Sequence, residues 1–298
     1  MKRIISILIL TLIFWQSNSL EAQSVVEIPP LFEYPNAPEE MESLEEKCNY
    51  LVKNFWNNFD FKTKQPIDQY ALNEAFSVYV TPMRYSNTKE VDQSVDKLIS
   101  KISGNPILLL QFTKAAEENL YGPRADFWSD TLYLKFLDAI IKNKKIKDNR
   151  KTKYLKQESA LRKSSEGSLA PTFDFTDING DKKTYFPMST PTLLIFGDPD
   201  NTDWRLARLK MDSNYRLEEA IDKGKLNILY ILPQETENWQ RIVSNYNPKW
   251  TIGASKEVSG IYDIRLDPSI YFIGSDGKIQ NKYLIFESDM RNVLDKLN

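Results

Sequence analysis

Residues 192–204 read TLLIFGDPDNTDW. The first five are apolar or β-branched, which predicts a buried strand over residues 192–196. The polar stretch 197–201 then leads directly into a helical pattern that begins near residue 202. A chain that leaves a buried strand and turns at once into a helix places side chains at a helix N-terminus, where backbone N–H groups lack partners. This turn is therefore the first candidate for a functional site.

Strands and helices alternate on both sides of this turn. Residues 172–177 and 183–186 flank Asn179-Gly180, a pair that favours a tight hairpin because both residues tolerate positive φ. The alternation predicts an α/β domain with a mixed sheet and helices on both faces. The other expected elements are helices between 202 and 223 with a break near 212–214, strand 226–232, a helix from 236 to 246, strand 269–273, strand 279–286 and helix 289–297.

The first half of the chain has a different pattern. From residue 39 to residue 161, apolar residues recur at spacings of three, four and seven, which is typical of amphipathic helices. One of these helices is expected to be capped by Asp126 or Ser129. The polar stretch 163–168 is interpreted as a joint between domains. The chain is thus predicted to be an α+β protein of two domains, an all-α domain over residues 23–163 and an α/β domain over residues 167–298.

Residues 1–22 have the pattern of a secretory signal peptide. Lys2 and Arg3 precede the apolar run 4–15, which is too short to span a bilayer, and a cleavage site is expected after Ala22. We expect the segment to be removed and the protein to be periplasmic or secreted; the alternative is an uncleaved anchor. No later stretch is apolar enough to predict a transmembrane helix.

The composition excludes several classes of function. A formal net charge of -2 over 298 residues gives no electrostatic basis for binding nucleic acid. The chain has a single cysteine, Cys48, and no histidine, so it has no intramolecular disulfide, no Ser-His-Asp or Cys-His catalysis and no histidine metal site. Asp198 and Asp203 do not fit a calcium loop, because an EF-hand requires glycine at the position of Asp203 and glutamate at that of Leu209. We predict no cofactor, no metal and no catalytic residue.

Four short stretches of the second half carry a family resemblance. In chain order they are APTFDF (170–175), LLIFGDPD (193–200), IYDI (261–264) and DPSIYFI (267–273) followed by DGKI (276–279). Over residues 167–298 the chain resembles the thioredoxin-like domains of cytochrome-maturation reductases and thiol-specific antioxidant proteins. The stretch YGPR (121–124), through Trp128 and Tyr133, resembles an uncharacterised helical domain that precedes thioredoxin-like domains in Gram-negative envelope proteins.

This resemblance implies a functional site at the helix N-terminus and also the loss of the family's redox chemistry. Active members of the family carry Cys-x-x-Cys at the helix N-terminus, where a thiolate is stabilised and attacks disulfides. The two corresponding positions are Asn201 and Trp204, and neither forms a thiolate. Members of the family also have a proline before the third strand of the core. It corresponds to Pro268, which follows Asp267. In relatives this proline is cis and faces the turn, which leaves backbone groups free to pair with an extended peptide.

Each candidate residue also has a structural interpretation. Asn201 is expected to be the N-cap of the helix from 202. Trp204 either packs in the core or lies on the former active surface as an aromatic contact. Cys48 lies on an apolar stripe and is expected to be a buried, inert thiol, whereas an intermolecular disulfide or a redox sensor requires its exposure. The basic run 142–156 is expected to be a solvated helix face, with contact to an anionic surface as the alternative.

The leading hypothesis is a non-catalytic binding or scaffolding module of the cell envelope. It would hold an unidentified protein or peptide across Asn201, Trp204, Asp267 and Pro268. One alternative is an enzyme, a thiol-disulfide oxidoreductase or peroxidase as in the family. The other is a C-terminal domain that only supports the helical domain.

Overall fold

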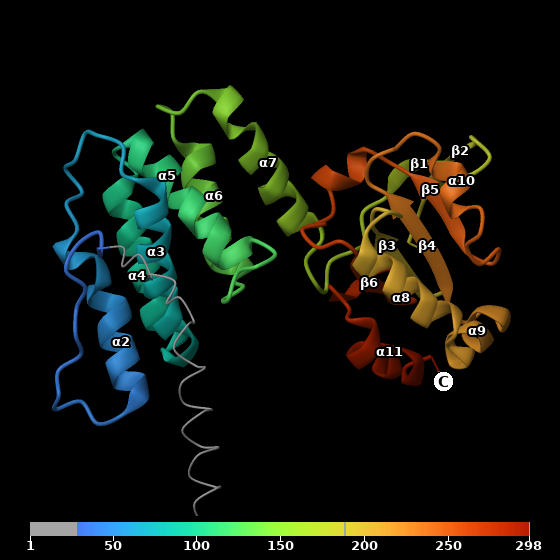
Figure 1. Cartoon of the computed structure of the whole chain (residues 1–298), viewed down its shortest axis with the longest axis horizontal. Coiled ribbons are helices and arrows are strands. Elements are labelled where there is room, and N and C mark those ends of the chain that lie inside the picture. The colour runs from blue at the N-terminus through green and yellow to red at the C-terminus, as the bar shows by residue number, and fades with distance from the viewer. Residues whose placement is uncertain (1–28, 188, 298) are drawn as a thin grey trace, which may run out of the picture.

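The structure is a computed structural model and describes residues 29–187 and 189–297. The predicted signal peptide, residues 1–22, lies outside the described residues. Within them, no helix combines the length and the apolar character needed to cross a membrane. Figure 1 shows a helical first half, in blue and green, next to an α/β second half in yellow to red.

The first half consists of helices that mostly start at a capping side chain. Ser43 forms a capping box with Glu46, and Asn105 accepts hydrogen bonds from two backbone N–H groups at the start of its helix. Of the two caps considered, Ser129 is the one that caps its helix. The helices are α2 (Leu44–Asn54), α3 (Gln69–Val80), α4 (Thr88–Ile102), α5 (Pro106–Ala116), α6 (Asp130–Lys142) and α7 (Asp148–Lys163), with the short turns η1 (Phe55–Asn58), η2 (Thr81–Tyr85) and the π-helical η3 (Glu117–Tyr121).

Aromatic rings fill the core of this half. Trp56 lies against Phe112 with ring centroids 5.0 Å apart, and Phe76 lies against Phe136 at 5.9 Å. Cys48 is only 5% exposed on the inner side of α2, as its place on the apolar stripe predicted. Helix α7 differs from the others, because it is highly charged and buries only Lys151, Ala160 and Leu161. It packs against α6 on one side and against the turn η4 (Glu257–Gly260) of the second half on the other.

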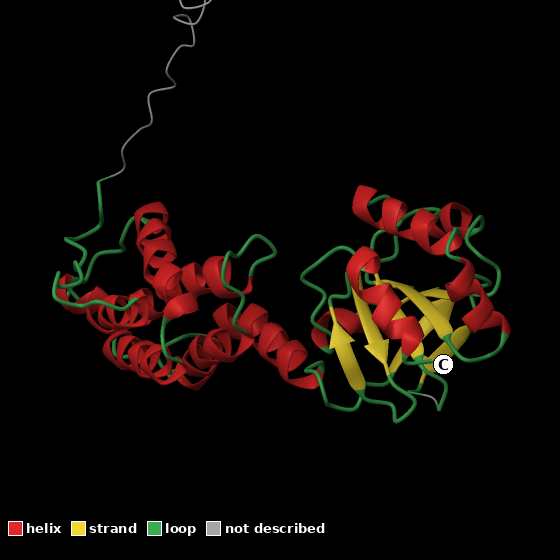
Figure 2. Ribbon diagram, turned by 90° about the horizontal axis from the view of Figure 1, so that it is seen from below, coloured by secondary structure: helices red, strands yellow, loops and turns green. Residues whose placement is uncertain are grey.

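The second half is built on a seven-stranded mixed sheet with the order β2-β1-β5-β4-β3-β6-β7 (Figure 2). The central strand β3 (Thr192–Phe196) is parallel to β4 (Asn227–Leu232) and antiparallel to β6 (Ser269–Ile273). This confirms the predicted fold class of a helical domain followed by an α/β domain with a mixed sheet. The other strands are β1 (Phe173–Asp177), β2 (Lys182–Tyr185), β5 (Thr251–Ala254) and β7 (Ile279–Lys282).

Both faces of the sheet are covered. Because successive side chains of a strand point to opposite faces, Leu193 and Ile195 of β3 face one hydrophobic cluster while Leu194 and Phe196 face another. The first cluster includes residues of the helices that follow β3, and the second includes Tyr262. The helices of this half are α8 (Thr202–Asp212), α9 (Tyr215–Asp222), α10 (Trp239–Val243) and α11 (Phe286–Asp295).

Three elements differ from the sequence-based expectation. Strand β5 was not predicted; its four residues include Gly253, where a Cβ atom would lie 2.3 Å from the ring of Phe175, so close packing rather than strand propensity selects this residue. The helix expected over 236–246 is limited to α10. The strand expected over 279–286 ends at Lys282, because Tyr283 has a φ of 58°, and α11 begins at Phe286.

Candidate functional site

Asn201 is the N-cap of α8, as predicted. Its backbone is extended, with φ -66° and ψ 132°, and its side-chain Oδ1 accepts hydrogen bonds from the backbone N–H groups of Asp203 at 2.8 Å and Trp204 at 3.1 Å. Asp203 lies in the first turn, where a negative charge interacts favourably with the helix dipole. The position that holds the first cysteine in active relatives thus stabilises the helix start.

Trp204 lies inside the domain and not on its surface. The side chain is 0% exposed and stacks on Tyr230 of β4, with ring centroids 4.6 Å apart and planes within 8°. Its Nε1–H donates a 3.0 Å hydrogen bond to the hydroxyl of Tyr246. Because the indole has both an apolar stacking partner and a hydrogen-bond acceptor, its burial is favourable. The prediction that Trp204 belongs to a partner-binding surface is therefore wrong. The alternative prediction, that it packs in the core, is confirmed.

The loop before β6 faces the turn between β3 and α8. The Asp267-Pro268 peptide bond is cis, and Pro268 is half-buried. The carboxylate of Asp267 accepts a 3.1 Å hydrogen bond from the backbone N–H of Asp198. A Cβ atom at Gly197 would lie 3.1 Å from the same carboxylate, so this close approach favours glycine. The structure thus brings Asn201, Asp267 and Pro268 together around the turn.

A groove of about 390 Å³ opens next to Pro268. Its apolar walls include Leu206 of α8, which is 51% exposed, and Ile285, which is 61% exposed. Sequence reasoning missed both residues, although an apolar residue on the outer face of a charged helix was an available signal. The lining residues are Asp203, Leu206, Ala207, Lys210, Leu266, Asp267, Pro268, Ile270, Tyr283, Leu284, Ile285 and Phe286.

The rim of this groove carries a net negative charge, because two carboxylates, those of Asp203 and Asp267, and one ammonium group, that of Lys210, line it. Burial raises the pKa of Asp267, and the nearby negative charges of Asp198 and Asp203 raise it further. A neighbouring carboxylate, that of Asp200, pairs with Arg205 at 2.7 Å. The groove therefore combines exposed apolar side chains with carboxylates whose charges repel one another and a single lining cation.

A second arrangement joins the two halves of the chain. The guanidinium of Arg265, whose side chain is 2% exposed, forms ion pairs with Asp263 and, at 2.5 Å, with Asp130 of α6. Lys282 also pairs with Asp130 and lies 3.8 Å from Asp263. The two carboxylates balance the two cations. Burial opposes the ionisation of Asp130, but Arg265 and Lys282 outweigh it and hold its pKa below the ordinary value.

Hydrogen bonds extend this network. The Tyr121 hydroxyl donates to Asp263 at 2.9 Å, and burial together with that carboxylate raises the Tyr121 pKa. The backbone N–H of Asp263 donates to the hydroxyl of Ser164 at 2.9 Å. We call these residues, Ser164, Tyr121, Asp130, Asp263, Arg265 and Lys282, the interdomain network. Sequence patterns do not predict this network, although Tyr121 and Asp263 lie in stretches that carry the family resemblance.

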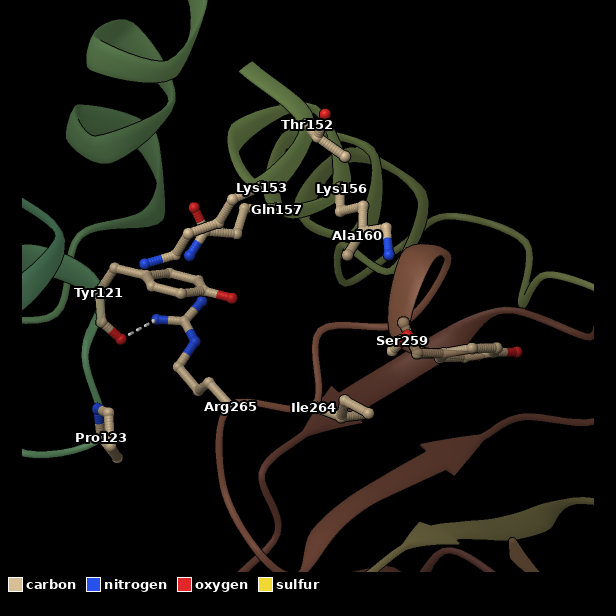
Figure 3. Close-up of a pocket in the computed structure, with 11 residues that line it drawn as sticks. Tyr121, Pro123, Thr152, Lys153, Lys156, Gln157, Ala160, Ser259, Ile264 and Arg265 are labelled. Atoms are coloured by element: carbon tan, nitrogen blue, oxygen red, sulfur yellow. Dashed lines mark hydrogen bonds between the residues drawn. The ribbon is translucent and has the colours of Figure 1, made fainter. Parts of the chain in front are cut away.

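An open cleft of about 590 Å³ lies next to the interdomain network. Figure 3 shows Tyr121 and Arg265 on one side of it, Ser259 on the other, and Lys156 with Ala160 on α7. Its lining residues are Tyr121, Pro123, Thr152, Lys153, Lys156, Gln157, Ala160, Ser259, Tyr262, Ile264 and Arg265.

One solved structure, which covers most of the chain, supports the fold of both halves. A thioredoxin-like protein from Bacteroides caccae is 18% identical, with a TM-score of 0.66 over 91% of this chain and 99% of that chain. A conserved protein of unknown function from Bacteroides fragilis is 25% identical, with a TM-score of 0.41 over 45% of this chain and 100% of that chain. A thiol-disulfide oxidoreductase from Bacteroides fragilis is 20% identical, with a TM-score of 0.37 over 44% of this chain and 100% of that chain.

The family assignment comes from the first half. No curated protein matches the sequence. The model of a domain of unknown function, DUF5106, matches residues 15–164, which is half of the chain. With one cysteine in the whole chain, the thioredoxin-like second half has no Cys-x-x-Cys pair. The chain belongs to the DUF5106 family and carries, after that domain, a thioredoxin-like domain without redox cysteines.

Proposed function

We propose that the protein is an exported, non-catalytic binding protein of the cell envelope, and that the groove beside Pro268 holds an extended segment of a protein partner. The observation that carries this proposal is a contrast within one site. The two dithiol positions hold a helix cap, Asn201, and a core residue, Trp204. The groove next to them remains open, apolar and acidic.

The chemistry of the groove defines the segment that fits it. Leu206 and Ile285 expose apolar surface that a leucine or aromatic side chain covers favourably. Asp203 and Asp267 favour lysine or arginine at the flanking positions. The preferred partner is therefore an extended segment with an apolar residue between basic ones.

Binding of labelled peptides tests this proposal. A fluorescein-labelled peptide with a central leucine or phenylalanine between lysines is titrated with the full mature chain and followed by fluorescence polarisation, beside an analogue with glutamates in place of the lysines. Leu206→Gln removes an apolar wall of the groove without changing its charge. Leu209→Gln is the matched control, because Leu209 is 56% exposed on the same helix and does not line the groove.

We expect the basic peptide to bind the wild type and Leu209→Gln and to lose most of its affinity for Leu206→Gln. The glutamate analogue is expected to bind weakly throughout. Equal affinity of both peptides, or equal binding by both variants, contradicts the proposal.

Export is the second part of the proposal, and it rests on the pattern of residues 1–22. N-terminal sequencing of the protein from an envelope fraction is expected to start at Gln23. Recovery of the chain from the cytosol with Met1 intact contradicts export.

The interdomain network favours a second candidate, in which the thioredoxin-like domain supports the DUF5106 domain. Arg265 and Lys282 form ion pairs with Asp130 of the helical half, as expected of a domain that holds another in place. Under this candidate, Leu206→Gln changes no interaction of the full chain. A partner that binds both the wild type and Leu206→Gln with one affinity supports it.

A further inference from the structure

The cleft between the two halves has a different character from the groove beside Pro268. It is bounded by α7 and by Tyr121 and Pro123 on the side of the helical half, and by Ser259, Tyr262, Ile264 and Arg265 of the other half. The interdomain network fixes one wall, because the side chain of Arg265 is held by Asp263, Asp130 and the Tyr121 carbonyl. The cleft is therefore held in shape without a ligand.

The charge that faces this cleft is positive. Lys153, Lys156 and Arg265 line it, and its lining residues include no aspartate or glutamate. Two of these cations have partners: Lys153 pairs with Glu117 at 2.7 Å, and Arg265 with the aspartates of the network. Lys156 forms no ion pair within residues 29–187 and 189–297. Its ammonium group is thus the one lining cation in this part of the chain that is not neutralised by a carboxylate.

The remaining walls suit an organic group. Ile264 is half-buried and provides aliphatic surface, whereas the lining residues Tyr262 and Ala160 are buried, at 0% and 3% exposed. Ser259 and Thr152 carry hydroxyl groups that each donate to a backbone carbonyl, at 3.2 Å and 3.4 Å, and retain oxygen lone pairs as acceptors. A bound molecule therefore meets apolar surface, hydroxyl oxygens and one free ammonium group.

From this combination we propose that the cleft binds a small organic anion, a carboxylate, sulfonate or phosphate ester whose acidic group pairs with Lys156. Its apolar part lies against Ile264. The pairing is charge-assisted, and because Lys156 is exposed its strength is that of a surface ion pair. The site is separate from the groove proposed to hold a peptide.

An amphipathic anion with a neutral counterpart tests the proposal. The probe is anilinonaphthalene sulfonate, titrated into the full mature chain and followed by its fluorescence. The comparison probe, N-phenylnaphthylamine, has the same ring system without the sulfonate. Lys156→Gln removes the proposed partner of the acidic group, and Ser259→Phe fills the cleft from the opposite side. Lys144→Gln is the matched control, because Lys144 is exposed before α7 and does not line the cleft.

We expect Lys156→Gln to raise the Kd of the sulfonate probe about two- to fivefold, the range of an exposed ion pair. Ser259→Phe is expected to abolish this binding, and Lys144→Gln to leave it unchanged. The neutral probe is expected to bind more weakly than the sulfonate to the wild type and to be insensitive to Lys156→Gln. Thermal unfolding of each variant confirms that it is folded.

The proposal is overturned if the sulfonate probe binds with the same Kd to the wild type, Lys156→Gln and Ser259→Phe. It is also overturned if Lys156→Gln and Lys144→Gln weaken binding equally, since that result reflects net charge alone. Either result leaves the peptide groove unaffected, because that groove has an acidic rim and is tested through Leu206.

Discussion

The guanidinium of Arg265 lies 3.8 Å from the centre of the Tyr121 ring, and its Nη1 donates a 3.0 Å hydrogen bond to the Tyr121 carbonyl. These residues belong to different halves of the chain. Cation–π contact, ion pairs and a hydrogen bond therefore converge on one buried side chain. Removing one member of such a network leaves the remaining charges buried without partners. The two halves are thus expected to depend on each other.

The first prediction concerns this dependence. Arg265→Met leaves Asp263, which is almost fully buried, without its main partner, so we expect a loss of about 3–5 kcal/mol in the free energy of unfolding. Arg162→Met is the control. Its ion pairs with Asp138 and Glu158 are half-exposed, and we expect a loss of about 1 kcal/mol or less. Urea denaturation followed by tryptophan fluorescence measures both, and equal losses contradict the role of the network.

The second prediction concerns the indole in the former active turn. Trp204→Ala removes a fully buried ring that stacks on Tyr230, so we expect a loss of about 3–5 kcal/mol. Trp204→Phe keeps an aromatic ring but loses the hydrogen bond to Tyr246, for which we expect a loss of about 1–3 kcal/mol. Denaturation midpoints measure both changes. A Trp204→Ala protein as stable as the wild type means that the indole is not a core residue.

The sequence predicts features that depend on neighbouring residues, and it does not predict features that depend on residues far apart in the chain. The cap at Asn201, the hairpin at Asn179-Gly180 and β3 depend on neighbouring residues, and all three were predicted. The burial of Trp204 depends on Tyr246, which is 42 residues away, so the sequence left core and surface equally open.

The interdomain network was missed for the same reason. Its two links to Asp130 join residues 135 and 152 positions apart, and no local pattern brings Asp130, Arg265 and Lys282 together. Only the packing of α7 and α6 against the second half places these side chains within bonding distance. The groove walls at Leu206 and Ile285 likewise come from separate helices and loops.

The third prediction uses the raised pKa of Asp267. Since burial raises this pKa above its value in the unfolded chain, the folded protein binds the proton more tightly, and the ionised carboxylate lowers stability at neutral pH. Asp267→Asn keeps an acceptor for the Asp198 N–H and removes the charge. We expect it to stabilise the protein at pH 7 by less than about 1 kcal/mol, because the residue is partly exposed.

The gain in stability expected for Asp267→Asn depends on pH. It is expected to disappear as the pH falls below the unfolded-state pKa of an aspartate, near pH 4, where Asp267 of the wild type is protonated in both the folded and the unfolded state. Thermal unfolding at pH 7 and at pH 3 measures the difference. The same variant is expected to bind the basic peptide more weakly at pH 7, because one carboxylate of the rim is lost. A variant that is less stable at pH 7 than the wild type contradicts the assignment.

The last prediction concerns Cys48, on which any thiol chemistry of this chain depends. The residue is 5% exposed, and burial raises the pKa of its thiol, so little thiolate forms near neutral pH. We expect dithiobis-nitrobenzoate to modify native protein slowly and the urea-unfolded chain at once. The positive control is Ser165→Cys in a Cys48→Ala background, since Ser165 is exposed in the joint between the domains. If Cys48 reacts as fast as the cysteine at position 165, or if the wild type reduces insulin and Cys48→Ala does not, the thiol is functional and the non-catalytic proposal fails.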